Sequence, residues 1–216
     1  MSKAFDRVDH HVLIEKITNS LPSGFVSWLR SYLSGRSFQV RIHGELSTPH
    51  YQAAGVPQGS VLGPALFSIL VGDISKHNKD NVFIQYADDL NIICPFVDIT
   101  QNTLQQRIVN QLEEVALWCS RNKQELNMDK SKFLLCTRQP LCLDDHFPIQ
   151  RVRSMKVLGI ILNEKLTWDE HVKELCKKAS QRLHVLRKVK PYLDQSELHT
   201  VYCSMIRSLF EYCCPV

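Results

Sequence analysis

The sequence predicts an α+β fold in which amphipathic helices are interleaved with short strands and hairpins. Several segments carry apolar residues at helical spacing, others carry short alternating or β-branched apolar runs, and turn-forming residues separate the two kinds. The chain has 216 residues, of which 44% are hydrophobic. This composition is typical of one globular domain, or of one domain with a small appendage, with enough apolar residues for a sizeable core.

Two helices are expected near the start of the chain. The first extends from Asp9 to about Leu21, with Asp9 as its cap and an apolar stripe formed by Val12, Leu13, Ile14 and Ile17. The second begins with Ser23 as its cap and ends before Gly35, which favours the left-handed conformation that follows many helices.

A half-buried strand is expected over residues 36–42, where Phe38, Val40 and Ile42 alternate with polar residues. The tripeptide His43-Gly44-Glu45 predicts a hairpin turn, from which the chain returns through residues 46–52.

Residues 55–64 form a loop with three glycines and two prolines, followed by an apolar run over 65–71 that predicts a buried helix. Such a loop suits a contact with a ribose or a phosphate, although it matches neither the P-loop nor the dinucleotide-binding fingerprint. A purely structural loop is an equally good interpretation of the spacing.

An acidic hairpin is predicted over residues 84–93. Asp88 and Asp89 stand together between two short apolar runs, which places both carboxylates at the tip of a strand, turn, strand arrangement. Adjacent carboxylates beside apolar strands repel each other unless a cation such as a divalent metal neutralises them. The alternative is an ordinary solvated turn, where aspartate is common.

The rest of the chain continues the alternation of helices and strands. We expect a long amphipathic helix over 98–121, a strand over 131–137, a surface loop over 140–148, a strand over 156–162, a helix from Asp169 that Pro191 breaks, and a last helix from about Gln195.

The helix from Asp169 has a strongly basic outer surface, which includes Lys173, Lys177, Lys178 and Arg182. It suits either a solvated face or contacts with phosphates. The net charge of +4 is compatible with a nucleic-acid partner without requiring one.

Other features bear on the environment of the protein. The eight cysteines lack the C-x-x-C spacing of a zinc site and are interpreted as free thiols of an intracellular protein. No segment has the pattern of a secretory signal or of a membrane span. We therefore expect a nuclear or cytoplasmic protein with no membrane partner.

Five motifs follow one another in a fixed order. They are Ser2-Lys3-Ala4-Phe5-Asp6-Arg7-Val8-Asp9-His10, Gly55-Val56-Pro57-Gln58-Gly59-Ser60, Tyr86-Ala87-Asp88-Asp89, Leu126-Asn127 with Lys130-Ser131, and Leu158-Gly159-Ile160-Ile161-Leu162 with Trp168 and His171. The residues of these motifs and their order resemble those of the reverse transcriptases of non-long-terminal-repeat retrotransposons, and the resemblance covers nearly the whole chain. The resemblance implies a polymerase palm over residues 1–165, with a small antiparallel sheet backed by helices, and the start of a helical thumb over 166–216.

The resemblance also implies roles for individual residues in RNA-directed DNA synthesis. That chemistry uses two Mg²⁺ ions about 3.5–4 Å apart, an RNA template, a DNA primer and a deoxynucleoside triphosphate. Asp88 would hold metal with Asp89 as its close companion, and Lys130 would approach the triphosphate as a charge partner or proton donor. Phe5 would exclude a 2′-hydroxyl, and Gln58 and Gly59 would border the nucleotide and template. Nucleic acid would lie against the primer-grip pair Leu158 and Gly159 and against the basic side chains of Lys173, Lys177, Lys178 and Arg182.

One departure from the family pattern affects the expected activity. In the family an aspartate that holds both metals stands two positions before the Ser-Lys-Ala-Phe-Asp motif, and here that position would precede Met1. We expect that Asp6, Asp9 and Asp73 do not replace it, that the fingers are missing as well, and that the chain by itself is inactive or nearly so. The alternatives are a non-catalytic nucleic-acid-binding remnant that clamps the template-primer duplex, and a translated relic with no selected activity.

Overall fold

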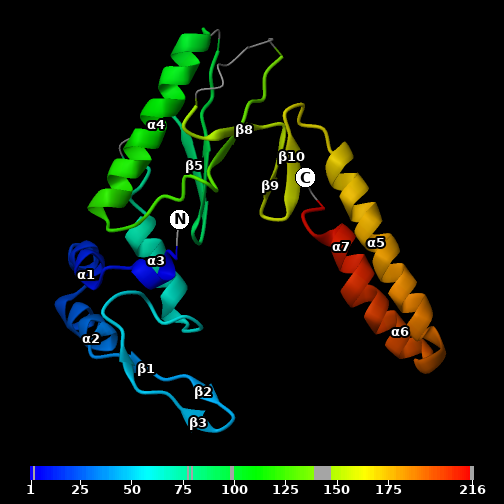
Figure 1. Ribbon diagram of the computed structural model, residues 1–216, viewed down its shortest axis with the longest axis horizontal. Helices are drawn as coiled ribbons and strands as arrows, with labels where there is room; N and C mark the ends of the chain where they lie inside the picture. The colour runs from blue at the N-terminus through cyan, green and yellow to red at the C-terminus, as the bar shows by residue number, and fades with distance from the viewer. Residues whose placement is uncertain (2, 77, 79, 98–99, 139–146, 215–216) are drawn as a thin grey trace. The chain divides into compact units, whose positions relative to one another are not determined.

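The computed structural model describes residues 1, 3–76, 78, 80–97, 100–138 and 147–214. These residues confirm the predicted α+β class, with helices and small sheets alternating along the chain (Figure 1). Two compact units are present, one built on Met1–Ser131 and the other on the strands and helices from Lys132 onward. The division into palm and thumb at residue 165 is a different boundary and stays a prediction.

The first unit contains four α-helices and three small antiparallel sheets among its described residues. In chain order its elements are the 3₁₀ turn η1 (Phe5–Arg7), α1 (His10–Thr18), α2 (Ser23–Leu33), β1 (Ser37–Phe38), β2 (Arg41–Ile42), β3 (Glu45–Leu46), β4 (His50–Tyr51), α3 (Leu62–Val71), β5 (Val82–Tyr86), β6 (Asp89–Ile93) and α4 (Gln101–Arg121).

The starts of the first two helices differ in how they are capped. Asp9 caps α1 as expected, because its carboxylate accepts a hydrogen bond from the backbone nitrogen of Val12 at 3.0 Å. Ser23 was expected to cap α2, and this prediction is wrong. Ser23 is the first helical residue and Pro22 holds the cap position without a side-chain bond, because proline has no side-chain oxygen to accept one.

The segment predicted as one strand over 36–42 is broken in the structure. β1 pairs with β4 and β2 pairs with β3, so the segment forms an arm of two short ladders instead of one continuous strand. Between the two ladders, the backbone nitrogen of Val40 donates to the side-chain hydroxyl of Ser47 at 3.0 Å, where a regular ladder would use a backbone carbonyl. The predicted turn is present at His43 and Gly44, which both have positive φ.

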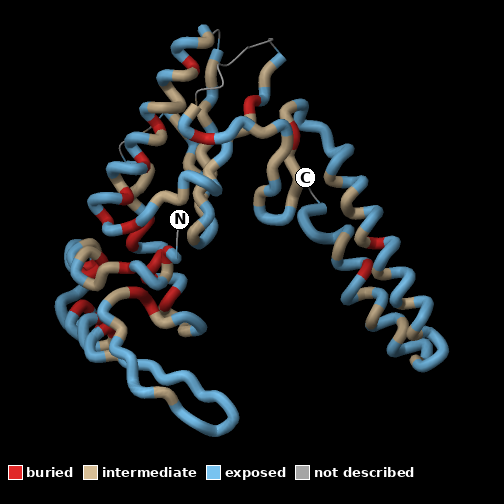
Figure 2. The backbone as a smooth tube through the Cα atoms, viewed as in Figure 1, coloured by how far each residue is buried: buried red, intermediate tan, exposed pale blue. Residues whose placement is uncertain are grey.

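The core of the first unit lies among α1, α2 and α3, where Figure 2 shows most of the buried residues. Ile17 of α1, Leu29 of α2 and Phe67 of α3 are each at most 1% exposed. The apolar run after the glycine-rich loop therefore forms the buried helix that was predicted.

A polar contact ties α4 to this core. Asp73, just beyond α3, accepts hydrogen bonds from Lys16 of α1 at 2.7 Å and from the Trp118 indole of α4 at 2.9 Å. Partial burial alone would raise the pKa of Asp73, but these two donors outweigh burial and lower it. Burial lowers the pKa of Lys16 in spite of its carboxylate partner.

The second unit contains two small sheets and a helical hairpin. Its elements are β7 (Lys132–Leu134), β8 (Gln150–Val152), β9 (Ser154–Val157), β10 (Ile160–Asn163), α5 (Asp169–Val189), η2 (Lys190–Tyr192), α6 (Gln195–Tyr202), the π-helical segment η3 (Cys203–Arg207) and α7 (Ser208–Glu211). β7 and β8 are parallel, which departs from the small antiparallel sheet that was predicted, and β8 has no counterpart among the predicted strands. The loop predicted over 140–148 lies almost entirely outside the described residues.

The strand predicted over 156–162 is a hairpin in the structure. β9 and β10 pair antiparallel around a turn at Leu158 and Gly159, whose φ angles are +46° and +93°. An uninterrupted apolar run hid this turn, since only Gly159 marks it in the sequence.

The helical hairpin of the second unit buries little of its surface (Figure 2). Ala179 of α5 and Ile206 of η3 are buried between the helices, and Asp194 and Glu197 form a capping box at the start of α6. Among the described residues, none of the helices has the length and apolar character that crossing a membrane requires.

Candidate functional site

The acidic pair lies at a tight hairpin, as the sequence predicts. Ala87 and Asp88 form a two-residue turn between β5 and β6, with Tyr86 paired to Asp89 across the ladder. Ala87 has a φ of +50°, which such turns require at their first position. Asp88 is half-buried and Asp89 is exposed, so both carboxylates can meet a cation from solvent.

The start of the chain lies beside this turn. The amino group of Met1 donates a hydrogen bond to the backbone carbonyl of Asp88 at 3.2 Å. A residue attached to the nitrogen of Met1 would therefore begin next to the acidic turn.

The first motif and the glycine-rich loop are joined by backbone hydrogen bonds. Gly55 donates to the carbonyl of Val8 at 2.7 Å, Val56 donates to the carbonyl of Phe5 at 2.9 Å, and a ring nitrogen of His10 lies 2.7 Å from the carbonyl of Gly55. A Cβ at Gly55 would lie 2.9 Å from the carbonyl oxygen of Asp6, and φ there is +92°, so this position requires glycine.

The predicted nucleotide-contacting residues lie in these two segments. The ring of Phe5 stacks on that of Phe67, with centroids 4.5 Å apart. The amide of Gln58 donates to the carboxylate of Asp6 at 2.7 Å, while the space in front of Gly59 is open. Phe5 is thus held by the core, and the segment with Gln58 and Gly59 faces solvent.

Lys130 follows α4 on a turn that Asn127 organises. The side-chain oxygen of Asn127 accepts from the backbone nitrogen of Lys130 at 3.0 Å, and its carbonyl accepts from the hydroxyl of Ser131 at 2.8 Å. Lys130 itself is exposed, and its ammonium group has no hydrogen bond or ion pair with another described residue.

Asp6, Asp9 and Asp73 each make other contacts in the first unit. Asp6 accepts from Gln58, and Asp73 holds Lys16 and Trp118. Asp9 caps α1 and pairs with Lys123 at 2.7 Å. Partial burial would raise its pKa, but the bonds from Lys123 and Val12 outweigh it and lower the pKa.

The donor set at the hairpin suits magnesium without forming a closed cage. Within the described part of the chain, no three side chains of His, Cys, Asp or Glu come together as a metal site. Mg²⁺ is commonly held by one or two carboxylates while water and substrate phosphates complete its shell. Asp88 and Asp89 fit this kind of partial site.

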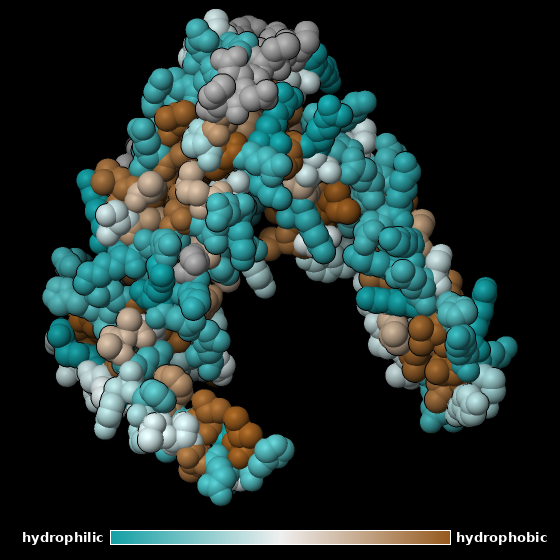
Figure 3. Space-filling view, in the orientation of Figure 1, coloured by the Kyte–Doolittle hydropathy of each residue, from teal (hydrophilic) through white to brown (hydrophobic). Residues whose placement is uncertain are grey.

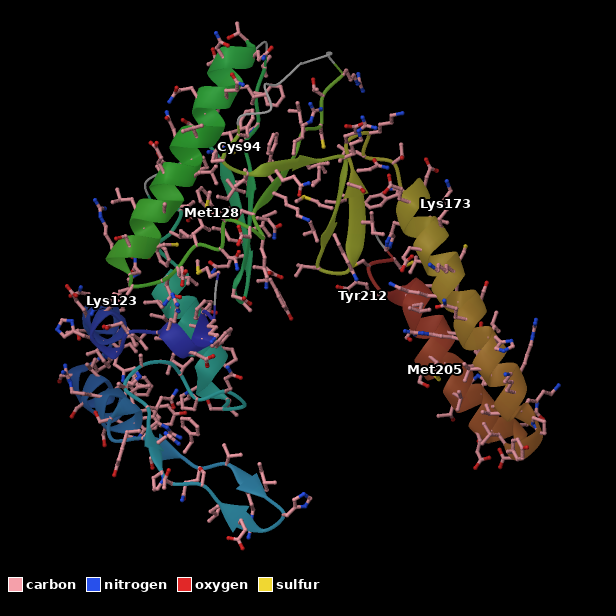
Figure 4. All side chains as sticks on the ribbon, viewed as in Figure 1. Cys94, Lys123, Met128, Lys173, Met205 and Tyr212 are labelled. Atoms are coloured by element: carbon pink, nitrogen blue, oxygen red, sulfur yellow. The ribbon has the colours of Figure 1, made fainter. Side chains whose placement is uncertain are left out.

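The predicted primer-grip pair forms the turn of the β9–β10 hairpin. The hydroxyl of Tyr212, just beyond α7, donates to the carbonyl of Leu158 at 2.5 Å (Figure 4). A Cβ at Gly159 would lie 3.2 Å from the ring of Tyr212. This tyrosine had no role in the sequence prediction, because nothing in the local pattern links it to a turn 54 residues earlier.

The four basic residues predicted to bind nucleic acid fall into two classes. Lys173, labelled in Figure 4, and Lys177 lie one helical turn apart on α5, are exposed, and form no ion pair with other described residues. Lys178 pairs with Glu174 at 3.4 Å, and Arg182 donates to the carbonyl of Met205. The first pair is available to a partner, whereas Arg182 holds α5 to the returning helix.

A hollow in the first unit is lined by residues other than those of the acidic hairpin. It has a volume of about 610 Å³ and lies between α1 and α2, where His10, Glu15 and Arg30 contribute to its wall. His10 belongs to the first motif, but none of the predicted catalytic or nucleotide-binding residues lines this hollow.

Comparisons with known proteins agree with the order of the motifs. Residues 1–162 match the family model described as reverse transcriptase (RNA-dependent DNA polymerase). The chain is 32% identical over 200 residues to the Drosophila melanogaster protein named "Probable RNA-directed DNA polymerase from transposon BS", covering 87% of this chain and 22% of that protein. It is 30% identical over 226 residues to the polymerase named for the X-element transposon of the same fly, covering 99% of this chain and 25% of the relative.

A third relative belongs to the same group. The chain is 30% identical over 184 residues to the RNA-directed DNA polymerase from the mobile element jockey of Drosophila melanogaster, covering 80% of this chain and 20% of that protein. The chain thus spans about a fifth to a quarter of the length of these relatives.

Proposed function

This chain belongs to the reverse transcriptase (RNA-dependent DNA polymerase) family, related to the polymerases of non-long-terminal-repeat retrotransposons, and we propose that it supplies the palm and the start of the thumb of such an enzyme. In this proposal residues 1–165 are the palm and 166–216 the thumb segment. The reaction is the extension of a DNA primer on an RNA template with deoxynucleoside triphosphates.

The observation that carries the proposal is the assembly of three motifs around one place in the first unit. Backbone hydrogen bonds join the first motif to the glycine-rich loop, and the amino group of Met1 joins the same segment to the turn at Asp88. The motifs are far apart in the sequence and are brought together by core packing and hydrogen bonds, an arrangement that would let them act on one substrate.

In the proposed mechanism, Asp88 and Asp89 would hold magnesium with their carboxylate oxygens. The bound ion would supply positive charge next to a primer hydroxyl and the reacting phosphate. Lys130 offers an unpaired ammonium group for the triphosphate.

Two groups of side chains would shape the nucleotide site. Phe5, held against Phe67, gives a rigid surface that excludes a sugar 2′-hydroxyl. Gln58 is positioned by Asp6, and Gly59 leaves its backbone open to the nucleotide and template. Packing and hydrogen bonds fix the positions of Phe5 and Gln58 before a substrate binds.

Two carboxylates alone bind Mg²⁺ weakly, so we propose that the 216-residue chain extends a primer slowly or not at all. A further carboxylate placed just before Met1 would begin beside the acidic turn, because the nitrogen of Met1 already lies 3.2 Å from the carbonyl oxygen of Asp88. Such a group would complete a three-carboxylate site.

The test compares two extended chains that differ only in whether the added residue carries a carboxylate or an uncharged amide. One carries an added aspartate before Met1 and the other an added asparagine, each behind the same short leader. We expect Mg²⁺-dependent primer extension at least about a hundredfold faster with the aspartate, since loss of one charged transition-state contact typically costs that much. Asp88→Asn in the aspartate-extended chain should abolish the gain. Equal rates for the two extended chains, or rapid synthesis by the 216-residue chain itself, would contradict the proposal.

In the second unit we propose that α5 contacts the template-primer duplex. Lys173 and Lys177 are exposed, form no ion pair with the residues that the structure describes, and lie one turn apart, a spacing that can meet phosphates along one strand. Charge reversal of both should lower duplex affinity and its salt dependence.

A further inference from the structure

A row of aromatic rings runs along the outer surface of α2. The ring centroids of Phe25 and Trp28 are 5.4 Å apart, and those of Trp28 and Tyr32 are 5.8 Å apart. The guanidinium of Arg36 lies 5.1 Å from the centre of the Tyr32 ring and closes the row. We call Phe25, Trp28, Tyr32 and Arg36 the α2 ladder.

The ladder is separate from the face that α2 buries. Val26, Leu29 and Leu33 enter the core and are at most 6% exposed, whereas Phe25 and Trp28 are 45% and 49% exposed. Tyr32 packs partly against the core, whereas Phe25 and Trp28 leave much of their ring surface open to a partner.

The arm that follows the ladder has the same character. Phe38 of β1 and His50 of β4 are paired across these two strands, with ring centroids 5.8 Å apart. Tyr51 of β4 is 82% exposed. Arg41 on β2 is exposed as well. Figure 3 shows hydrophobic side chains gathered on this arm, where Ile42 is 63% exposed.

Charge distinguishes this surface from an ordinary apolar patch. Residues 16–72 contain a single acidic residue, Glu45, although the whole chain has 22. The same segment has four basic residues, and apart from Lys16, which pairs with Asp73, they are Arg30, Arg36 and Arg41. A partner that complements it must offer negative charge together with flat apolar faces.

We propose that the α2 ladder and the β1–β4 arm bind single-stranded nucleic acid, with unpaired bases stacked on the rings and phosphates held by Arg36 and Arg41. Rings that offer open faces beside cations are typical of single-strand binding, because every unpaired base has an aromatic face and every nucleotide a phosphate. A duplex hides its base faces and fits this surface poorly. This inference rests on the proposed function, because the single strand that binds here is taken to be the unpaired part of the RNA template.

The test measures the affinity of the 216-residue chain for a labelled, unstructured RNA of about 12 nucleotides by fluorescence anisotropy, without Mg²⁺ or nucleotides. Trp28→Ala should weaken binding about tenfold, the typical effect of losing one base-stacking ring. Arg41→Gln should reduce the slope of log affinity against log salt by about 0.7, as expected for one phosphate contact with a single strand. The matched controls Tyr192→Ala and Arg121→Gln change exposed side chains of the same types elsewhere and should leave affinity and slope unchanged.

A conservative variant separates stacking from folding. Trp28→Phe keeps an aromatic face, so it should bind RNA within about threefold of the parent chain while losing the quenching of tryptophan emission that stacking causes. Circular dichroism before each titration establishes that the variants are folded.

Two further variants separate this surface from the other proposals. Reversing the charges of Lys173 and Lys177 should lower duplex affinity and spare the single strand. Asp88→Asn should abolish polymerase activity in the extended chain and spare RNA binding, so the two proposals can fail independently.

Unchanged RNA affinity in folded Trp28→Ala and in Arg41→Gln would overturn the inference. So would sedimentation showing that the parent chain self-associates through this face and that Trp28→Ala is monomeric, since the occupant would then be a second copy of the chain.

Discussion

Asp73 and Asp88 show how the surroundings of a carboxylate determine what it can do. The carboxylate of Asp73 accepts hydrogen bonds from Lys16 and from the indole of Trp118. Its charge thereby joins α1 to α4. The carboxylate of Asp88 forms no ion pair with another described residue and lies at a turn open to solvent, where the amino group of Met1 bonds only the backbone carbonyl. The first carboxylate is structural, and the second is free to meet a metal.

Removing the charge of Asp73 should destabilise the first unit. Asp73→Asn should lower the free energy of unfolding by about 2 kcal/mol, because hydrogen bonds to charged groups contribute about 1.5–3 kcal/mol and Lys16 would stay partly buried without its partner. Urea unfolding at neutral pH measures this change. Asp129→Asn, at an exposed aspartate, is the control and should have little effect.

The stability of the same variant at different pH values shows whether Asp73 stabilises the fold through its negative charge. The pKa of Asp73 is lowered in the folded state, so its stabilising effect is present above its ordinary pKa of 3.8 and is lost as pH falls through the lower folded value. The difference in stability between the parent chain and Asp73→Asn should therefore shrink below about pH 4. A difference that stays constant down to pH 2 would show that Asp73 does not act through its charge.

Sequence patterns predict some of these residues and miss others for a physical reason. Asp88 follows a β-branched run and precedes another, so its place at a turn is a local property. The contact between Lys16 and Asp73 joins residues 57 positions apart, and no local pattern contains it. The ring row on α2 was missed because its aromatic residues fall among apolar residues at helical spacing, and only the structure shows that Val26, Leu29 and Leu33 are buried while Phe25 and Trp28 are exposed.

At the level of elements, periodic helices were predicted well and short strands less well. Long segments such as α4 and α5 repeat their apolar stripe over several turns, which fixes their type and nearly their ends. The hairpin at Leu158 was predicted as one strand, since apolar residues continue through its turn. The parallel pairing of β7 with β8 depends on a contact between separate segments, which periodicity alone does not contain.

Tyr212 should stabilise the turn of the β9–β10 hairpin. Tyr212→Phe keeps the ring beside Gly159 and removes the hydroxyl that donates to Leu158. We expect a loss of about 1 kcal/mol, the usual contribution of one hydrogen bond, together with faster amide hydrogen exchange at the turn. Tyr192→Phe, at a tyrosine that is 85% exposed, is the matched control. Equal exchange rates in the two variants would show that the contact does not order the turn.

At the scale of the whole molecule, charge is distributed unevenly along the chain. Residues 16–72 hold one acid, while α5 in the second unit carries Lys173 and Lys177 unpaired on its surface. A chain with a net charge of only +4 therefore presents two basic surfaces, one rich in aromatic rings and one without them. The two surfaces suit different forms of nucleic acid, unpaired bases in the first case and duplex phosphates in the second.

The family was recognisable from the order of the motifs, whereas the shape of the site required the structure. The sequence places the first motif, the glycine-rich loop and the acidic pair far apart, and in the folded unit hydrogen bonds such as those from Gly55, Val56 and Met1 join them. The relatives named above are four to five times longer than this chain, so the activity of a complete protein is a separate question from the chemistry of this unit.

The central claim is that the turn at Asp88 and Asp89 holds the metal, and a paramagnetic ion tests it most directly. Mn²⁺ has oxygen-ligand preferences similar to those of Mg²⁺ and broadens the NMR signals of nearby nuclei. Titrated into the 216-residue chain, it should first broaden the amide signals of Ala87, Asp88 and Asp89. Asp88→Asn should remove this broadening, whereas the control Asp129→Asn should retain it. Broadening that is centred elsewhere in the chain, or that persists in Asp88→Asn, would contradict the assignment of this hairpin as the metal site.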